Sequence, residues 1–298
     1  MKIRNQKTRL GVGILVLAIL LAPIITTADD GQGRFARPLS GTSFHDFTLG
    51  LSVGFQTQLR EGWSVFPIGN CGPYDEEIED FGTNRVWRVS NAVTCESFGD
   101  QPFAPRPGGI PNDFVNDPDN SEPLFFAGET STGAAARGFS SQFSFRSKTG
   151  AAQPGLRITV SIDNGQGARQ SFVALRDTGS GIDVDTFDVD KNGIFIGPIT
   201  IASGLSYTDW HTVAMVATFK DGENDDQVEY FIDGKRQHRG TSWEQFYRNF
   251  QATQHPLGVP VQTLLFRLSG TAAPAAFGNG FYIDNVFTSL FAGRSDDD

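Results

Sequence analysis

The clearest chemical pattern in the sequence is Asp188-Val189-Asp190-Lys191-Asn192-Gly193. Its spacing matches the first half of a calcium-binding loop, in which Asp188, Asp190 and Asn192 present oxygen ligands and the final glycine allows a sharp turn. The twelfth position of such a loop holds a bidentate Glu, but here it is Ile199. The segment therefore fits either a weak calcium site or a polar hairpin turn, and both interpretations stay open.

Other reactive residues form no recognisable active site. Asn224-Asp225-Asp226 is a second acidic run that fits either calcium binding or a solvated turn. Gly50-Leu51-Ser52-Val53-Gly54 matches the motif around a nucleophilic serine, but the helix and the α/β alternation that this motif needs do not follow it. We interpret His211, which follows Trp210, as structural. The sequence has four histidines, His45, His211, His238 and His255. None of them stands in a recognisable catalytic motif.

The sequence contains two cysteines, Cys71 and Cys95. An even number of cysteines favours a disulfide in an exported protein, and closing a loop of this length stabilises a fold by roughly 3 kcal/mol. Two free thiols in a reducing compartment are the alternative. We expect the Cys71–Cys95 disulfide because the N-terminal segment indicates export.

The first 28 residues have the order of a secretory signal peptide. Four basic residues precede an apolar run from Leu10 to Ile25, and Thr26-Thr27-Ala28 leads into an acidic stretch. The part of the run before Pro23 is shorter than the ~20 residues that span a membrane, so cleavage near Ala28 is favoured over an anchor helix. We predict a secreted, periplasmic or cell-surface protein whose mature chain has no membrane span.

The mature chain is strongly acidic. The full chain has 24 basic and 34 acidic residues and a net charge of −10, and loss of the four leader cations makes the net charge −14. Such a surface repels nucleic acid and anionic membranes. We therefore exclude nucleic acid as a partner and expect neutral partners or cations.

Short apolar alternations, separated by Gly, Asp and Asn, run through most of the mature chain. Residues 156–162 alternate apolar and polar side chains, as a strand with one buried face does. Tyr230-Phe231-Ile232 enters an Asp-Gly turn, which favours a hairpin. The pattern predicts an all-β sandwich. Further strands are expected at 85–90, 138–145, 171–175, 210–219, 261–268 and 281–287.

One segment has helical spacing instead. Thr241 and Glu244, three residues apart, match a capping box at the start of a helix. Four aromatic residues recur there at intervals of three and four, and these are Trp243, Phe246, Tyr247 and Phe250. We predict a short helix near 242–250 whose aromatic side chains pack on the sandwich, with a sugar-binding platform as the alternative.

Four blocks stand in a set order between residues 44 and 290. They are Gly62-Trp63-Ser64, the run from Arg88-Val89-Ser90-Asn91 to Gln101, Tyr230-Phe231-Ile232-Asp233-Gly234 leading to Gly240-Thr241-Ser242-Trp243-Glu244, and Gly280-Phe281-Tyr282-Ile283-Asp284-Asn285-Val286. Together they resemble exported bacterial proteins of the laminin-G-like, concanavalin A-like jelly-roll class. The resemblance implies a jelly-roll β-sandwich whose terminal strand at 281–287 pairs with an N-terminal strand at 44–49. The class includes lectins, carbohydrate-binding modules and polysaccharide-degrading enzymes, so fold alone does not decide the function.

The enzymes of this class have patterns that the sequence does not reproduce. Its retaining glucanases carry alternating carboxylates on one strand, and the nearest string here is Glu76-Glu77-Ile78-Glu79-Asp80. Glu77 and Glu79 would share a face, but no Asp stands between them on it, and we interpret the string as a solvated acidic loop. The sequence has neither the Gln-Ile-His-type block nor the Arg-rich strand of the alginate lyases. The resemblance also suggests a structural calcium at Asp284.

These observations favour an exported, non-catalytic lectin-like domain that recognises carbohydrate or a cell surface. The alternatives are a polysaccharide-degrading hydrolase or lyase with an unrecognised site, and a structural envelope or adhesive protein without a glycan ligand. Glycans are the expected partners, and Ca²⁺ is a candidate cofactor beside the interpretation of its residues as polar turns. The candidates for aromatic side chains that stack on sugars are Trp63, Trp87, Tyr207 and Trp210. Each of them could equally lie in the core. The expected organisation is a signal peptide at 1–28, a linker at 29–43, the sandwich at 44–290 and an acidic tail at 291–298.

Overall fold

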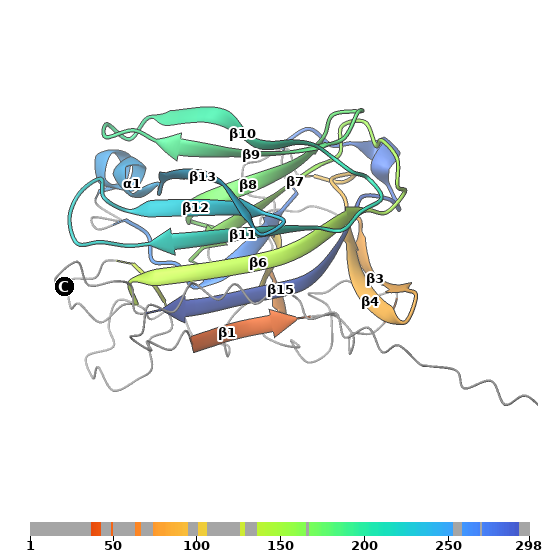
Figure 1. The fold of residues 1–298 in the computed structure, drawn as a ribbon, viewed down its shortest axis with the longest axis horizontal. Helices are drawn as coiled ribbons and strands as arrows, with labels where there is room; N and C mark the ends of the chain where they lie inside the picture. The colour runs from red at the N-terminus through yellow and green to blue at the C-terminus, as the bar shows by residue number, and fades with distance from the viewer. Residues whose placement is uncertain are drawn as a thin grey trace, which may run out of the picture. The chain divides into compact units, whose positions relative to one another are not determined.

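Two antiparallel sheets make up the described part of the chain (Figure 1). The structure, a computed structural model, describes residues 37–42, 49, 63–66, 74–94, 101–105, 126–128, 136–164, 167–252, 258–268 and 270–291. The predicted all-β jelly-roll sandwich is confirmed. Within the described ranges, none of the helices has the length and apolar character needed to cross a membrane.

The first sheet has eight strands. They are β1 (Arg37–Thr42), β3 (Glu76–Phe81), β4 (Asn84–Val89), β6 (Gly138–Ser147), β11 (His211–Thr218), β12 (Gln227–Ile232), β13 (Lys235–Thr241) and β15 (Phe281–Phe291). Their order is β13-β12-β11-β6-β15-β4-β3, and β1 pairs with β15. Asp233 and Gly234 have positive φ values between β12 and β13, so the predicted Asp-Gly hairpin turn is present.

The second sheet has seven strands. They are β2 (Trp63–Phe66), β5 (Gln101–Pro105), β7 (Arg157–Asp163), β8 (Arg169–Asp177), β9 (Ile182–Val189), β10 (Phe195–Leu205) and β14 (Thr263–Arg267). Their order is β10-β9-β8-β7-β14-β5-β2, and a short 3₁₀ helix (Pro274–Ala276) precedes β15.

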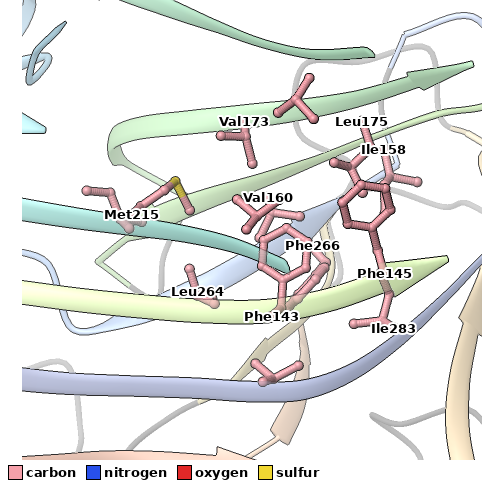
Figure 2. Close-up of a cluster of buried hydrophobic side chains, with 14 of the residues drawn as sticks. Phe143, Phe145, Ile158, Val160, Val173, Leu175, Met215, Leu264, Phe266 and Ile283 are labelled. Carbon is pink, nitrogen blue, oxygen red and sulfur yellow. The ribbon is translucent and has the colours of Figure 1, made fainter. Parts of the chain in front are cut away.

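Apolar side chains from the inner faces of both sheets fill the space between them (Figure 2). Phe143 and Phe145 on β6 and Ile283 on β15 belong to the same buried cluster as Phe266 on β14. The ring centroid of Phe266 lies 5.5 Å from that of Phe143 and 5.0 Å from that of Trp87, both in edge-on geometry. Because side chains alternate along a strand, the residues beside these rings point to the outer faces.

The predicted short helix is present as α1 (Glu244–Phe250). Trp243 and Tyr247 form a second buried cluster with Phe172 and Val189, which come from β8 and β9. Core packing of these two aromatic side chains is therefore confirmed. The prediction is wrong for Phe250, which lies at the end of the helix and is 58% exposed.

The predicted capping box is wrong. Trp243 is the residue before the helix and its side chain makes no capping hydrogen bond, while the N–H of Glu244 donates to the Ser242 hydroxyl at 3.1 Å. The Thr241 hydroxyl instead donates to the backbone oxygen of Val189 and accepts its N–H, each at 2.8 Å. The Glu244 carboxylate accepts the N–H of Asn224 at 3.2 Å. Both side chains bond to backbone groups of neighbouring segments, which the local pattern does not reveal.

The N-terminal strand that pairs with β15 begins earlier than predicted. β1 covers Arg37–Thr42 and pairs with residues 286–290 of β15, whereas the prediction placed this strand at 44–49. Of that range the structure describes only Leu49, which lies in an exposed turn. Backbone pairing needs no apolar alternation, and the sequence of β1 has almost none. The sandwich therefore includes residues that the sequence assigned to a linker, and the other domain boundaries remain predictions.

Gly280 is needed where β15 begins. Its φ is +98°, and a Cβ at this position would lie 2.2 Å from the backbone oxygen of Val89. Gly280→Ala should destabilise the fold by about 3 kcal/mol or more, because it adds a backbone clash to an unfavourable φ. Denaturant-induced unfolding measures the loss. Gly204→Ala is the matched control, since Gly204 has a φ of +66° with nothing within 4 Å of the added Cβ. Equal losses in the two variants would contradict the clash.

Candidate functional site

One end of the outer face of the first sheet gathers aromatic and charged side chains. On β15, the core residues Phe281 and Ile283 flank Tyr282, which therefore points outward. Tyr282 lies opposite Arg88 of β4 and opposite Arg146 of β6. These three side chains form a row across three adjacent strands, although they are far apart in the sequence.

Three aromatic residues lie together beside this row. The ring centroid of Phe81, the last residue of β3, is 5.6 Å from that of Trp210 and 5.4 Å from that of Tyr282. Phe81 and Trp210 are half-buried, so part of each ring meets solvent. We call Phe81, Trp210 and Tyr282 the aromatic patch. Such rings offer an apolar surface with a polar edge, which suits a ligand of mixed character.

Three cations border the aromatic patch. The Arg146 guanidinium carbon lies 5.3 Å from the Phe81 ring centroid, and Lys148 Nζ lies 6.0 Å from that of Tyr282. Arg88 is buried, and it forms ion pairs with the carboxylates of Asp75, Glu77 and Glu79. These ion pairs hold Asp75 and the acidic side chains of Glu77 and Glu79 on β3 against the sheet.

Glu79 connects the cations to the aromatic patch. Its carboxylate accepts hydrogen bonds from Lys148 Nζ at 2.6 Å, Arg88 Nε at 2.8 Å and the Tyr282 hydroxyl at 3.0 Å. Burial alone would raise the pKa of Glu79, but these donors and positive charges hold it below its usual range. Burial and the bond to Glu79 raise the pKa of Tyr282 to about 12. At neutral pH, Glu79 is therefore an anionic acceptor and Tyr282 a neutral donor.

The string Glu76-Glu77-Ile78-Glu79-Asp80 is strand β3, so its interpretation as a solvated loop is wrong. Trp87 Nε1 donates to the buried carboxylate of Glu76 at 2.9 Å. The acidic residues look solvated in the sequence because their partners lie on other strands. Lys148, for example, is 69 positions from Glu79 along the chain.

The aromatic residues singled out from the sequence have different positions. Trp87 is fully buried in the core, and Tyr207 packs against the core and donates its hydroxyl to Asp177 at 2.8 Å. Trp210 lies at the surface within the aromatic patch. The side chain of Trp63 lies outside the described part of the structure. His211 Nδ1 lies 2.8 Å from Asp233 Oδ2, which agrees with the structural role predicted for His211.

Within the predicted calcium loop, Asp188 contacts a neighbouring strand, whereas Asp190 and Asn192 bond within the turn. Asp188 Oδ2 lies 3.0 Å from His238 Nε2. Asp190 Oδ1 accepts the N–H groups of Ile194 at 2.8 Å and Asn192 at 2.9 Å, and these bonds lower the pKa of Asp190. The Asn192 side-chain amide also donates to Asp190, at 3.3 Å. This is the geometry of the polar hairpin turn, and calcium binding by the three residues stays a prediction.

A different group of carboxylates lies close together. Asp225, Asp226 and Glu244 each have a carboxylate oxygen within 4.8 Å of the others. Arg248 forms an ion pair with Glu244 and offsets part of the negative charge. The sequence singled out Asp225 and Asp226, but it could not indicate Glu244, which α1 brings to the same place.

Asp284 is a buried carboxylate on the outer face of β15. Asn84 Nδ2 donates to its Oδ2 at 2.9 Å, and the N–H of Asn285 donates to its Oδ1 at 2.8 Å. Burial raises the pKa of Asp284 to about 6, although these two donors partly oppose the shift. The contacts of Asp284 among the described residues are with N–H donors, and its role as a calcium ligand remains a prediction.

Two other surfaces are less suited to a polar ligand. An apolar hollow of about 360 Å³ lies between the β9–β10 turn and α1, and it is lined by Gly193, Ile194, Phe195, Phe246 and Phe250. On the outer face of the second sheet, Arg176 bonds to Asp183 and Asp185, and Thr200 donates to Asp185. The residues that line the hollow have no polar side chain, and the four polar side chains named on the second sheet bond to one another.

Several residues predicted to be important lie outside the described ranges. They are Cys71, Cys95, the signal peptide at 1–28 and residues 292–298 of the acidic tail. The disulfide and the export of the protein therefore stay predictions.

Comparisons with known protein families and with curated proteins each found no match. Among solved structures, the chain is similar to a sialidase, with 11% identity and a TM-score of 0.44 over 88% of this chain. It spans 19% of the length of that sialidase. It is also similar to the alginate lyase Aly36B, with 10% identity and a TM-score of 0.45 over 87% of this chain and 100% of the lyase. Galectin LEC-6 of Caenorhabditis elegans shares 10% identity and a TM-score of 0.30 over 52% of this chain and 84% of the galectin. None of these likenesses assigns an activity to the chain.

The raised pKa of Asp284 predicts a pH-dependent effect of Asp284→Asn. A carboxyl whose folded-state pKa is about 6, against an ordinary value of 3.8, destabilises the fold when it ionises. The cost is absent below about pH 4, grows between pH 4 and 6, and reaches about 3 kcal/mol above that range. The melting temperature of Asp284→Asn relative to the native protein should therefore be higher at pH 7.5 than at pH 4. Asp80→Asn, at an exposed position of β3, is the control. The same pH dependence in both variants would contradict the assignment.

Proposed function

We propose that the protein is an exported, non-catalytic carbohydrate-binding protein whose site is the aromatic patch. One observation carries this proposal: the half-buried rings of Phe81 and Trp210 are bordered by the charged side chains of Arg146, Lys148 and Glu79. The proposed export rests on the signal-peptide pattern at the N-terminus.

The chemistry of the aromatic patch matches that of a sugar ring. A pyranose has an apolar face of C–H groups that can stack on an aromatic ring, and its rim carries hydroxyls that need donors and acceptors. Phe81 and Trp210 supply the apolar surface. The network around Glu79 is held in place by Arg88 and Lys148 before any ligand arrives, so binding orders few side chains and costs little entropy.

Polysaccharide degradation is the second candidate function, and one observation favours it. Asp284 and Glu79 lie on the same face of the sheet, with the pKa of Asp284 raised to about 6 and that of Glu79 lowered. Carboxyl groups with separated pKa values suit a general acid and a general base. The register places β4 between their strands, since Val86 pairs with Glu79 and the next residue of β4 pairs with Ile283.

Trp210→Ala tests the binding proposal. We expect the native protein to bind at least one class of sugar on a glycan array. Titration of that glycan should show at least about tenfold weaker binding to Trp210→Ala, because the stacking surface is lost. Trp210→Phe keeps a ring and should retain most of the affinity.

Phe250→Ala is the matched control for this substitution, since it removes an exposed ring outside the aromatic patch and should leave the affinity unchanged. An assay for new reducing ends runs in parallel on the native protein and on Asp284→Asn. Catalytic release of ends that Asp284→Asn abolishes would support the second candidate instead. Binding to no glycan, or equal losses in Trp210→Ala and Phe250→Ala, would contradict the site.

Calcium binding by Asp188, Asp190, Asn192 or Asp284 is also proposed, from the sequence pattern and the resemblance. Millimolar calcium should then raise the melting temperature, because an ion that binds only the folded state stabilises it. Asp190→Ala should abolish the rise if the hairpin turn holds the ion, and Asp284→Ala should abolish it if β15 does. Asp225→Asn reports on the carboxylate cluster beside α1. An unchanged melting temperature, with and without chelator, would contradict calcium binding.

A further inference from the structure

Arg146 differs from the other two cations at the aromatic patch. Lys148 and Arg88 both contact carboxylates. The Arg146 side chain makes no ion pair or hydrogen bond with any residue that the structure describes, and its guanidinium lies over the Phe81 ring. Its Nε–H is buried and has no acceptor among the described residues.

An acceptor for Arg146 is not supplied by its neighbours on the sheet. Tyr282 lies opposite Arg146, but the Tyr282 hydroxyl is bonded to Glu79. The outer-face neighbours of Arg146 along the chain are Ser144 and Lys148, neither of which is an anion. The nearby carboxylate of Asp284, on the residue that pairs with Ser144, is bonded to Asn84 and to the N–H of Asn285 and forms no ion pair with Arg146. Arginine stays charged in proteins, and a buried N–H without an acceptor is costly. The charged guanidinium of Arg146 therefore lies at the edge of the aromatic patch without an anionic partner among the described residues.

We infer that the ligand of the aromatic patch is an acidic saccharide whose carboxylate or sulfate group binds Arg146, an inference that rests on the proposed function. The sugar ring stacks on Phe81 and Trp210, and its anionic substituent meets the guanidinium that lies over Phe81. Charge-assisted hydrogen bonds from guanidinium to carboxylate or sulfate are stronger than those to neutral hydroxyls. Arg146 thereby selects a charged sugar over a neutral one.

The overall negative charge of the chain means that selection of a charged sugar depends on short-range contacts. A net charge of −10 repels polyanions at long range, so general electrostatic attraction cannot account for binding of an acidic saccharide. Preference for the charged form must come from contacts within hydrogen-bond distance. Substitution of Arg146 should therefore reduce the preference for the charged saccharide, whereas removal of a distant cation should leave that preference unchanged.

The inference is tested by calorimetric titration with an oligogalacturonate and with its methyl ester, in which a methyl group replaces the negative charge of each carboxylate. The charged oligomer should bind about 10- to 100-fold more tightly to the native protein. A sulfated galactan oligomer and its desulfated form make the second arm, which separates sulfate from carboxylate as the recognised group. A preference in either arm supports the inference.

Substitutions of Arg146 connect the preference to this side chain. Arg146→Gln should remove most of the preference for the charged oligomer, and Arg146→Lys should keep part of it. Lys235→Gln removes an exposed cation on β13 and should change nothing. Thermal unfolding of each variant confirms that it folds.

Three outcomes distinguish failure of this inference from failure of the proposed function. Tight binding of a neutral glycan that Trp210→Ala abolishes, with no preference in either arm, would overturn the acidic ligand and leave the carbohydrate site intact. No binding of any saccharide in the arms or on the array would overturn both. A preference that survives in Arg146→Gln would overturn the role of Arg146.

Discussion

The packing of Phe266 against Trp87 and Phe143 joins the two sheets, and the placement of the candidate site depends on it. Trp87 and Phe143 come from the first sheet and Phe266 from the second, and all three are fully buried. Side chains alternate along a strand, so an inward Trp87 requires an outward Arg88. A slip of one residue would exchange them and bury an ion-paired arginine in an apolar core, which is strongly unfavourable.

The charged groups on the outer face are organised around buried Arg88. Its three carboxylate partners neutralise its charge and accept hydrogen bonds from its N–H groups, as burial of an arginine requires. Such a network contributes less to stability than to geometry, because the cost of desolvating the charges offsets much of their attraction. Its consequence for function is that Glu79 and Tyr282 are fixed in place, while Arg146 alone among the three cations forms no ion pair within the described chain.

The hairpin between β9 and β10 shows how one pattern can serve two structures. Closely spaced Asp and Asn side chains ahead of a glycine present oxygen atoms to a bound ion, or to the N–H groups of their own turn. Asp190 does the second, through the N–H groups of Asn192 and Ile194. Asp188 belongs to β9 and faces His238 on β13, so it is part of the contact between two strands and not of the turn.

The sequence by itself determined the class of fold, most of the strands, the hairpin at Asp233 and the short helix after Trp243. These follow from periodicity and turn chemistry, which act over a few neighbouring residues and repeat along the chain. Only the tertiary structure decided where the candidate site lies, because Phe81, Arg146, Trp210 and Tyr282 come from four separate segments. Alternation indicates which face of a strand a side chain occupies, but the identity of the neighbouring strand depends on long-range pairing. That pairing brought Glu79 beside Lys148 and left the guanidinium of Arg146 over an aromatic ring, and no local pattern could have shown either.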